Sequence, residues 1–452
     1  MKIIIAGDGK VGATLTRQLL AEGHDLTLID SNSNVLETSE EQYDVLTVRG
    51  NCASMAVLRE AGVAGAQLLI AATSADEINM LCCITAHGMN PQLHTIARIR
   101  NPEYLEQTYA MRDVFALSLA VNPEKQAARE IMRLIQYPGF LKRDTFAKSR
   151  AEIVELQVEE KSCLCGTPLS ALSSAVHCRV LVCAVSRDGH AVAPDGSFVL
   201  RAGDRIFVTA GEDNLALMLK NLGVIPHKAK RVLLAGGGRV SYYLAQELQN
   251  SGIMAEIIEQ DPARCAQLAQ LLPNACIIQG DASRQELLES EGLARCDAFV
   301  SMTGIDEQNI ILSLYGRNCG VPQVITKLGR SENMQLVNEL HLGSVVCPKD
   351  LCCTTIVRYV RAMQNQVGAA ITVHSIADGQ AEAMEFLVGD GAHHCGEPLH
   401  ALHLRPNVLI ASISHSGKIE IPNGASSFAQ GDTLVAVTSG NTAIRCLNDI
   451  FA

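Results

Sequence analysis

The chain has 452 residues, more than one hydrophobic core usually supports, so we expect two or more domains. Its 37 basic and 48 acidic residues give a formal net charge of −11, which argues against a general binder of nucleic-acid backbones. Hydrophobic residues make up 48% of the sequence and charged residues 19%, which excludes large-scale disorder and indicates tightly packed α/β cores.

The first third of the chain alternates short β-branched runs with helical patterns. The runs that predict strands are Lys2 to Ala6, Leu26 to Ile29, Val45 to Val48, Leu68 to Ala72 and Thr95 to Ile99. Alternation of this kind is typical of βαβ crossovers on a parallel sheet. The proline of Asn122-Pro123 then predicts the start of a helix that leads out of the sheet.

A shorter segment comes next, in which β-strand patterns dominate. Val154 and Leu156 alternate with Glu155 and Gln157, which predicts a strand with one face in solvent. Turn-forming residues, such as Asp188-Gly189, separate further short strands. We therefore expect a small β-rich module in this part of the chain.

The whole pattern is then repeated at an offset of 229 or 230 residues. The corresponding positions are Gly7 and Gly236, Asp30 and Glu259, Asn79 and Asn309, and, in the β-rich segments, Cys165-Gly166 and Cys395-Gly396. A self-similarity that runs the length of the chain indicates a duplication. The order of the modules is therefore N-type, C-type, N-type, C-type.

These patterns predict an α/β protein made by tandem duplication of a Rossmann-like parallel-sheet domain followed by a small β-rich α+β domain. We place the Rossmann-like domains at residues 1–141 and 228–366, and the β-rich domains at residues 142–227 and 367–452. The helices expected after Pro123 and Pro348 carry apolar faces that need a partner. We expect these two helices to join neighbouring Rossmann-like units.

The loop Gly7-Asp8-Gly9-Lys10-Val11-Gly12 lies between a predicted strand and a predicted helix, as the dinucleotide-binding fingerprint requires. Gly7 permits the tight turn, Gly9 lets the backbone approach a pyrophosphate, and Gly12 allows helix and strand to pack closely. Asp30 closes the second strand, where a carboxylate accepts hydrogen bonds from ribose hydroxyls and disfavours NADP. The alternative is that the glycines only make a sharp turn and that Asp30 only caps the next helix.

Later strand ends should converge on the same crevice, since ligands of such sheets lie outside the carboxyl ends of the strands. Arg98 either neutralises phosphate charge or is a surface cation with a solvated head. Asp76 and Glu77 are equally explained as first-turn helix acids. The candidate ligand-binding residues of the first copy are Gly7, Gly9, Lys10, Val11, Gly12, Asp30, Asn51, Cys52, Thr73, Asp76, Glu77 and Arg98.

The second copy keeps this design with some substitutions. In Gly236-Gly237-Gly238-Arg239-Val240-Ser241, Ser241 replaces the third glycine and is small enough for close packing. Glu259 replaces Asp30, which predicts a second nucleotide site, and the sequence leaves open whether its selectivity differs from that of the first. The candidate residues of this copy are Gly236, Gly238, Arg239, Val240, Glu259, Gly280, Asp281, Thr303 and Lys327.

The sequence assigns no catalytic residue and no metal site. A dehydrogenase needs a proton donor or acceptor beside the nicotinamide, and the repeated residues of the β-rich segments are turn formers and strand hydrophobics. His393-His394-Cys395 lacks the spacing of a metal site. The 16 cysteines occur mostly beside apolar residues, so we expect reduced, buried thiols.

No stretch of the sequence approaches the roughly 18 apolar residues that a spanning helix needs, so we expect no transmembrane segment. Met1 to Ile5 runs straight into the glycine loop, without the apolar region and cleavage site of a signal peptide. We therefore expect the chain to stay in the cytoplasm.

The glycine loop with Asp30, the Thr73 to Asn79 segment, the β-rich turns and the full-length duplication resemble the regulator-of-potassium-conductance (RCK) family. The resemblance covers essentially the whole chain. It implies a non-enzymatic regulator whose Rossmann-like domains bind NAD or NADH, with ATP and ADP as competing regulatory ligands. It also implies a homo-oligomeric ring, expected to be a tetramer, at the inner face of the cell membrane beneath a Trk-type potassium translocator.

Two other functions remain open from the sequence. An NAD-dependent oxidoreductase would share the glycine loops, but it would need an acid–base residue that neither repeat supplies. A regulator of another cation system, such as an antiporter, would share all of the modules, and analogy of fold alone does not separate it from a potassium regulator.

Overall fold

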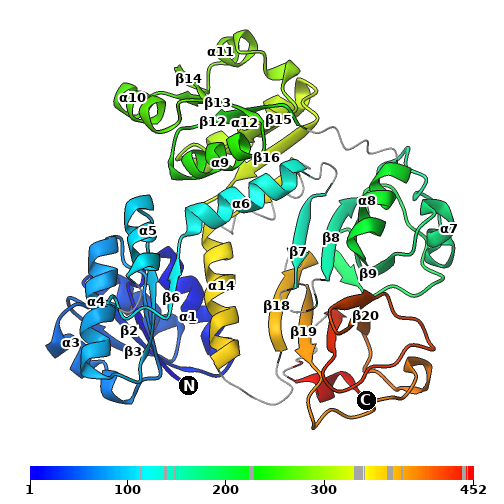
Figure 1. Ribbon diagram of the computed structural model, residues 1–452, viewed down its shortest axis with the longest axis horizontal. Coiled ribbons are helices and arrows are strands. Elements are labelled where there is room, and N and C mark those ends of the chain that lie inside the picture. The colour runs from blue at the N-terminus through cyan, green and yellow to red at the C-terminus, as the bar shows by residue number, and fades with distance from the viewer. Residues whose placement is uncertain are drawn as a thin grey trace. The chain divides into compact units, whose positions relative to one another are not determined.

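The computed structural model describes all residues except 112–113, 137–139, 147–148, 150, 223–228, 330–339, 341, 364–369, 378–379, 440–443 and 445. Figure 1 labels the helices and strands of the chain, which divides into two compact units. The first consists of Met1–Arg129, Gly329–Ser331 and Cys347–Val360, and the second of Glu130–Leu328, Glu332–Val346 and Arg361–Ala452. The expected domain boundaries after residues 227 and 366 lie outside the described residues.

The first unit is built on a parallel sheet in the order β3-β2-β1-β4-β5-β6. Its strands are β1 (Lys2–Ala6), β2 (Asp25–Asp30), β3 (Leu46–Arg49), β4 (Leu68–Ala71), β5 (His94–Arg98) and β6 (Leu119–Val121). Its crossover helices are α1 (Lys10–Ala21), α2 (Ser33–Gln42), α3 (Met55–Glu60), α4 (Asp76–Met89) and α5 (Pro102–Ala110). The strand order reverses between β1 and β4, so their carboxyl ends form the position where such sheets bind ligands.

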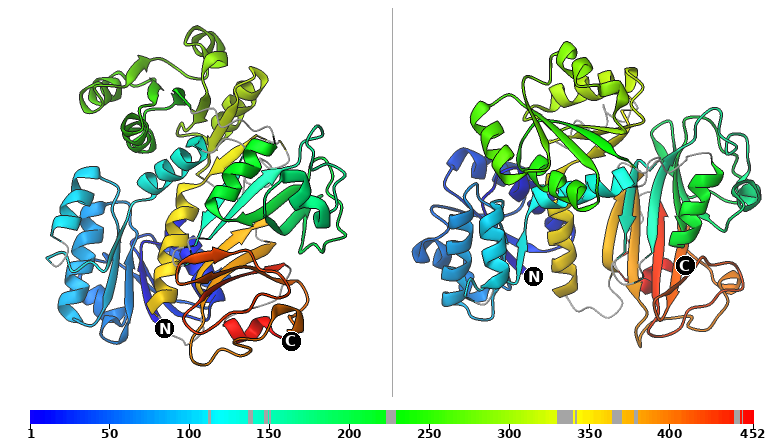
Figure 2. Two further views of the ribbon diagram at one scale, coloured as in Figure 1. Left: turned by 45° about the vertical axis from the view of Figure 1, so that its right-hand side comes forward. Right: turned by 45° about the horizontal axis from the view of Figure 1, so that its top comes forward.

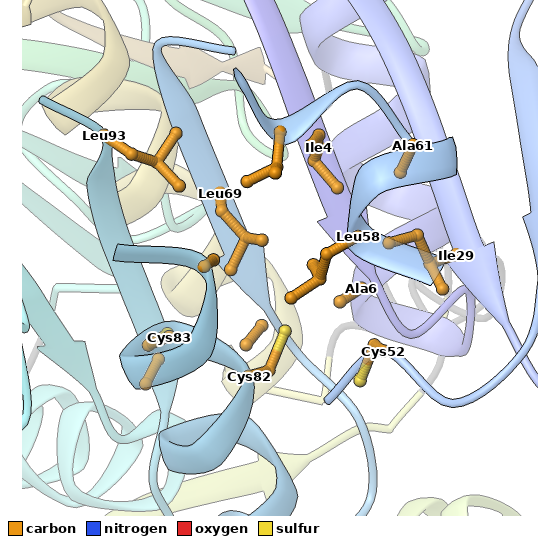
Figure 3. Close-up of a cluster of buried hydrophobic side chains, with 14 of the residues drawn as sticks. Ile4, Ala6, Ile29, Cys52, Leu58, Ala61, Leu69, Cys82, Cys83 and Leu93 are labelled. Carbon is orange, nitrogen blue, oxygen red and sulfur yellow. The ribbon is translucent and has the colours of Figure 1, made fainter. Parts of the chain in front are cut away.

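A cluster of buried side chains holds α3 and α4 against this sheet (Figure 3). Leu58 of α3 packs with Ile4 and Leu69 of the strands, and all three are almost fully buried. Cys82 and Cys83 of α4 belong to the same cluster, and burial raises the pKa of the Cys83 thiol. These two cysteines therefore serve as small apolar residues.

The second unit contains a parallel sheet with the same topology, in the order β14-β13-β12-β15-β16-β17. Its strands are β12 (Arg231–Ala235), β13 (Met254–Glu259), β14 (Cys276–Gln279), β15 (Ala298–Ser301), β16 (Gln323–Lys327) and β17 (Ser344–Val346). Its helices are α9 (Arg239–Asn250), α10 (Pro262–Leu271), α11 (Gln285–Ser290) and α12 (Asp306–Asn318). The predicted duplication of the Rossmann-like fold is thus confirmed.

Two antiparallel sheets complete the second unit, in the orders β10-β9-β11-β8-β7 and β18-β19-β22-β20-β21. The strands of the first are β7 (Lys142–Thr145), β8 (Glu152–Gln157), β9 (Leu181–Arg187), β10 (His190–Val192) and β11 (Arg205–Ala210). Those of the second are β18 (Ala370–Ile376), β19 (Ala381–Leu387), β20 (Val408–His415), β21 (Lys418–Glu420) and β22 (Thr433–Ser439). The first sheet is accompanied by α7 (Leu172–Val176) and α8 (Glu212–Asn221), and the predicted fold class is confirmed.

The expectation that these β-strands have one face in solvent is wrong. Glu155 on β8 is 4% exposed and its counterpart Glu385 on β19 is 0% exposed. The reason is that the two antiparallel sheets, whose strands Figure 2 shows, pack against each other. Phe207 of one sheet and Val435 of the other belong to the same hydrophobic cluster. Glu155 is therefore buried, and its carboxylate forms a salt bridge with Arg205 at 2.5 Å. This partner offsets the cost of burying the charge.

Two helices leave the parallel sheets, α6 (Pro123–Gln136) after the first and α14 (Pro348–Met363) after the second. Each contacts the opposite copy of the repeat. In the first unit, the Cys353 thiol of α14 lies 3.8 Å from the carbonyl oxygen of Val11 on α1. In the second, Gln323 Nε2 of β16 donates to the carbonyl oxygen of Leu134 on α6 at 2.6 Å. Both contacts join a connecting helix to the Rossmann-like copy from the other half of the chain, and the expectation that these helices join neighbouring Rossmann-like units stays a prediction.

All 16 cysteines are free, and nine of them are buried. Cys163, Cys276 and Cys395 are exposed, so the expectation of buried thiols fails at these three positions. Among the described residues, no helix has the length and apolar character that crossing a membrane requires.

The contact between the antiparallel sheets includes an ionised group whose effect depends on pH. Asp144 of β7 lies 3.1 Å from Lys142 Nζ and 3.3 Å from His374 Nδ1 of β18. Burial alone would raise the pKa of Asp144, but the two bases outweigh burial and lower this pKa to about 2. The carboxylate therefore stabilises the folded state at neutral pH.

We expect Asp144→Asn to lower the free energy of unfolding at pH 7 by about 2 kcal/mol. Because the pKa of the folded state lies below that of the unfolded state, this contribution is complete above about pH 4 and is lost as the pH falls towards 2. Chemical denaturation from pH 7 to pH 2 should therefore show the two proteins converging in acid. Asp213→Asn, at an exposed position, is the control. If Asp144→Asn differed from the wild type in unfolding free energy by the same amount at every pH, the stabilising role of the Asp144 carboxylate would be contradicted.

Candidate functional site

The first glycine loop is shaped by close contacts that only glycine permits. Gly7 has a φ of +97°, and a Cβ there would lie 2.8 Å from the backbone nitrogen of Thr73. A Cβ on Gly12 would lie 2.1 Å from the carbonyl oxygen of Gly7, so α1 packs directly on the loop. At Gly9 nothing lies within 4 Å of a Cβ position, so the surface of the loop is open there. Gly7 and Gly12 thus build the loop, and Gly9 leaves room above it.

The amino-terminal end of α1 is the electropositive part of this site. Among the described residues, no side chain caps the helix and its first turn holds no acid. The α9 helix of the second copy begins in the same way after Gly238. The first N–H groups of both helices are therefore available to an anion, which the helix dipole also favours.

The acid at the end of the second strand is bonded to the glycine loop. Asp30 Oδ2 accepts the N–H of Asp8 at 2.8 Å, and Asp30 Oδ1 accepts the N–H of Asn32 at 2.9 Å. The α2 helix is capped by Asn32, whose side chain accepts the N–H of Asn34, so the alternative of Asp30 as the helix cap is wrong. Each carboxylate oxygen keeps a second lone pair for another donor.

The second copy repeats this arrangement with a longer acid. Glu259 Oε2 accepts the N–H of Gly237 at 2.7 Å, and Oε1 accepts the N–H of Asp261 at 2.9 Å. Ser241 is fully buried, and its hydroxyl donates to the carbonyl oxygen of Gly236. The hydroxyl satisfies a loop carbonyl, which explains how serine is accommodated where the first copy needs glycine.

An asparagine joins the ends of the next two strands; we expected it after the fourth strand, at the crevice, but did not count it among the candidate ligand-binding residues. Asn79 Oδ1 accepts the N–H and the hydroxyl of Thr73 at 2.8 and 2.7 Å, and Nδ2 donates to the carbonyl oxygen of Arg98 at 2.9 Å. Asn309 makes the same three contacts, with Thr303 and Lys327. The signal available in the sequence was the recurrence of Asp-Glu-x-Asn in both copies.

A base from the fifth strand lies beside this junction. Arg98 Nη2 donates to the carbonyl oxygen of Thr73 at 2.6 Å, and Lys327 Nζ donates to that of Thr303 at 2.7 Å. Arg98 Nε is buried and has no hydrogen-bond partner among the described residues. Burial lowers the pKa of Arg98, whose side chain is partly buried against the end of the fourth strand.

The remaining candidates occupy different places around the crevice. Asp76 Oδ2 accepts two backbone N–H groups beyond the end of β5, those of Arg100 and Asn101, at 2.9 and 2.7 Å. Glu77 is exposed in the same first turn of α4. The Cys52 thiol belongs to the hydrophobic core rather than to an exposed surface.

The loops after the third strands have the same construction in the two copies. Asn51 Oδ1 accepts the N–H of Ala53 at 3.0 Å, and Asp281 Oδ1 accepts the N–H of Ser283 at 2.9 Å. Gly280 allows the side chain of Leu287 to pack against the backbone. In the part of the chain that the structure describes, no group of three or more His, Cys, Asp or Glu residues is arranged to hold a metal ion.

Comparison with known proteins identifies the family. The TrkA-N domain model matches residues 3–116 and 232–348, and the TrkA-C domain model matches residues 153–223. The Trk system potassium uptake protein TrkA of Haemophilus influenzae is 31% identical over 100% of this chain and 98% of its own length. The chain belongs to the TrkA family. A TrkA homologue of Archaeoglobus fulgidus is 29% identical over the whole of both chains.

Solved structures confirm the RCK fold that the sequence resemblance implied. The GsuK RCK domain superposes with a TM-score of 0.62 at 18% identity, over 97% of this chain and 92% of that chain. The GsuK channel bound to NAD gives a TM-score of 0.61 at 18% identity, over 97% of this chain and 76% of that chain. The two TrkA-N matches of the family model coincide with the two parallel sheets.

The two loop glycines should respond differently to an added methyl group. Gly12→Ala should lower the free energy of unfolding by about 1–3 kcal/mol, because its Cβ collides with the backbone of Gly7. Gly9→Ala should leave the stability nearly unchanged but weaken NADH binding about tenfold or more, because its Cβ enters the open space above the loop. Chemical denaturation and calorimetric titration would measure both effects, and normal NADH binding by Gly9→Ala would contradict this placement of the ligand.

Proposed function

We propose that the chain is the nucleotide-sensing regulatory subunit of a Trk-type potassium uptake system. The observation that carries this proposal is the pair of glycine loops, each with an open helix N-terminus and a carboxylate fixed beside it. Nucleotide binding at these loops shifts the conformation of a homo-oligomeric ring, a tetramer, that controls a membrane potassium translocator. The subunit works in the cytoplasm, at the inner face of the membrane.

The ligands of this proposal are NAD or NADH, with ATP and ADP competing for the same loops. A diphosphate fits the open N–H groups of α1 and α9, since both the N–H donors and the helix dipole favour an anion. Asp30 and Glu259 accept hydrogen bonds from ribose hydroxyls and repel a 2′-phosphate. GsuK, whose fold this chain shares, has been solved with NAD and with ADP bound, which supports the same class of ligand here.

The contacts of α1 also provide a route by which a nucleotide bound at the first glycine loop could affect α14 and α6. Val11 lies in the first turn of α1, where a phosphate would bind, and its carbonyl oxygen contacts the Cys353 thiol of α14. Further along α14, Thr355 Oγ1 accepts from Gln126 Nε2 of α6 at 2.9 Å. A ligand that repositions the first turn of α1 therefore acts on the helix from the other copy. A nucleotide that binds one conformation of the ring more tightly than another shifts the equilibrium between them. The shift equals the difference in binding free energy, typically about 1–3 kcal/mol per site.

The proposed subunit binds its ligands and does not convert them. The described groups at the crevice are backbone N–H donors, carboxylates held by backbone N–H groups, and the cations Arg98 and Lys327. Such groups recognise anions and hydroxyls, whereas hydride transfer needs a proton donor or acceptor placed at the substrate. NADH should therefore be recovered unchanged after incubation with the protein.

Removing the fixed carboxylates tests the proposal. Asp30→Ala and Glu259→Ala should each weaken NADH or ATP binding at their own copy about tenfold, because the ribose loses a charge-assisted hydrogen bond. Isothermal titration calorimetry of the full chain measures this effect. Asp25→Ala, at the opposite end of the same strand as Asp30, is the matched control and should bind normally. Unaltered affinity in both test variants would remove the carboxylates from the site.

A further inference from the structure

The two glycine loops differ at their middle residue, and the difference extends to the helix that faces them. In the first copy this residue is Asp8, which is 2% exposed. Its Oδ2 accepts the hydroxyl of Ser39 on α2 at 2.6 Å. Its Oδ1 is buried and has no hydrogen-bond partner among the described residues. The first loop thus contains a buried carboxyl close to the anion-binding end of α1.

The second copy cannot hold such a carboxyl. The corresponding residue is Gly237, and a Cβ there would lie 2.7 Å from Leu268 Cδ1 and 2.9 Å from Glu259 Oε2. Leu268 of α10 stands 229 residues after Ser39, so the partner of Asp8 has been replaced together with Asp8 itself. The two changes are matched, because a carboxyl without the serine hydroxyl would be buried unpaired.

The same helix brings a cation to the second loop. Arg264 Nε donates to the carbonyl oxygen of Gly237 at 2.7 Å, and Nη2 lies 3.5 Å from that of Gly238. Its Nη1 donates to Gln267 Oε1 at 2.5 Å. A guanidinium has five N–H donors, so this one keeps donors for a further acceptor. The corresponding residue of the first copy, 229 positions earlier, is the apolar Val35.

The loops therefore differ in the side chain held beside them, a buried carboxyl in the first and a partly exposed guanidinium in the second. Lys10 and Arg239 occupy equivalent positions at the start of α1 and α9, so they do not distinguish the copies. The distinguishing groups are the carboxyl of Asp8 and the guanidinium of Arg264. A cation beside a phosphate chain favours the more anionic ligand, and a carboxyl disfavours it. In NAD⁺ the nicotinamide offsets part of the diphosphate charge, whereas ADP and ATP carry no such compensation.

We propose that Arg264 makes the second glycine loop selective for adenosine di- and triphosphates over NAD⁺, and that Asp8 gives the first loop the opposite preference. This inference rests on the proposed function, because it assigns different ligands to the two sites of that proposal. One chain then senses two classes of nucleotide at once. The preference of the first loop is set by Asp8, and that of the second loop by Arg264 on α10.

Calorimetric titration of the full chain with ATP and, separately, with NAD⁺ tests the assignment. Arg264→Val, which installs the residue of the first copy, should weaken ATP binding at one site about tenfold and change NAD⁺ binding less than about threefold. Arg264→Lys keeps the positive charge and should retain most of the ATP affinity. Thermal unfolding without ligand shows whether each variant remains folded.

Titration of Arg264→Val tests the selectivity of the second loop, and titration of the wild-type chain tests nucleotide binding itself. An equal loss of ATP and NAD⁺ affinity in Arg264→Val would overturn the inference, since a purely structural role affects both ligands alike. Tighter ATP binding by this variant would also overturn it, because Arg264 would then cover the site. If the wild-type chain binds neither nucleotide, the proposed function itself fails. Selective loss of ATP binding, restored by lysine, is the result that we expect.

Discussion

The hydrogen bond between the glycine loop and the acid of the neighbouring strand holds the rest of the site in place. Asp8 donates its N–H to Asp30, and Gly237 donates its N–H to Glu259 in the same way. This bond fixes the loop against the sheet, so that the first turn of the following helix stays open to an anion. The substitution at Ser241 is tolerated because the buried hydroxyl satisfies a loop carbonyl without disturbing that bond.

The two repeats cover apolar surfaces of each other. Each antiparallel sheet buries its outer face on the other, with Phe207 and Val435 in the shared cluster. Each connecting helix contacts the Rossmann-like domain of the opposite copy, as the contacts of Cys353 and Leu134 show. A single repeat without a partner would leave these surfaces exposed, which is unfavourable in water. The proposed coupling of ligand binding to conformation uses the same shared contacts.

The sequence was most informative where local pattern determines structure. The parallel sheets, the glycine loops and the carboxylate after the second strand follow from periodicity, glycine spacing and one acid. The burial of Glu155 and Glu385 could not be predicted, because alternation reports only the face that packs on its own module. Arg264 was missed, and the contacts that Asn79 makes were not predicted, for a related reason. Their roles depend on carbonyl oxygens of other segments, and such contacts leave no periodic signal in the sequence.

Regulation as proposed requires that an occupied glycine loop act mechanically on a helix from the other copy. Hydrogen–deuterium exchange of the full chain, with and without saturating ADP or NAD⁺, tests this requirement most directly. We expect slower exchange both in the first turn of α1 and in α14, whose Cys353 thiol contacts the Val11 carbonyl oxygen. Protection confined to the glycine loop, with exchange in α14 unchanged, would contradict it.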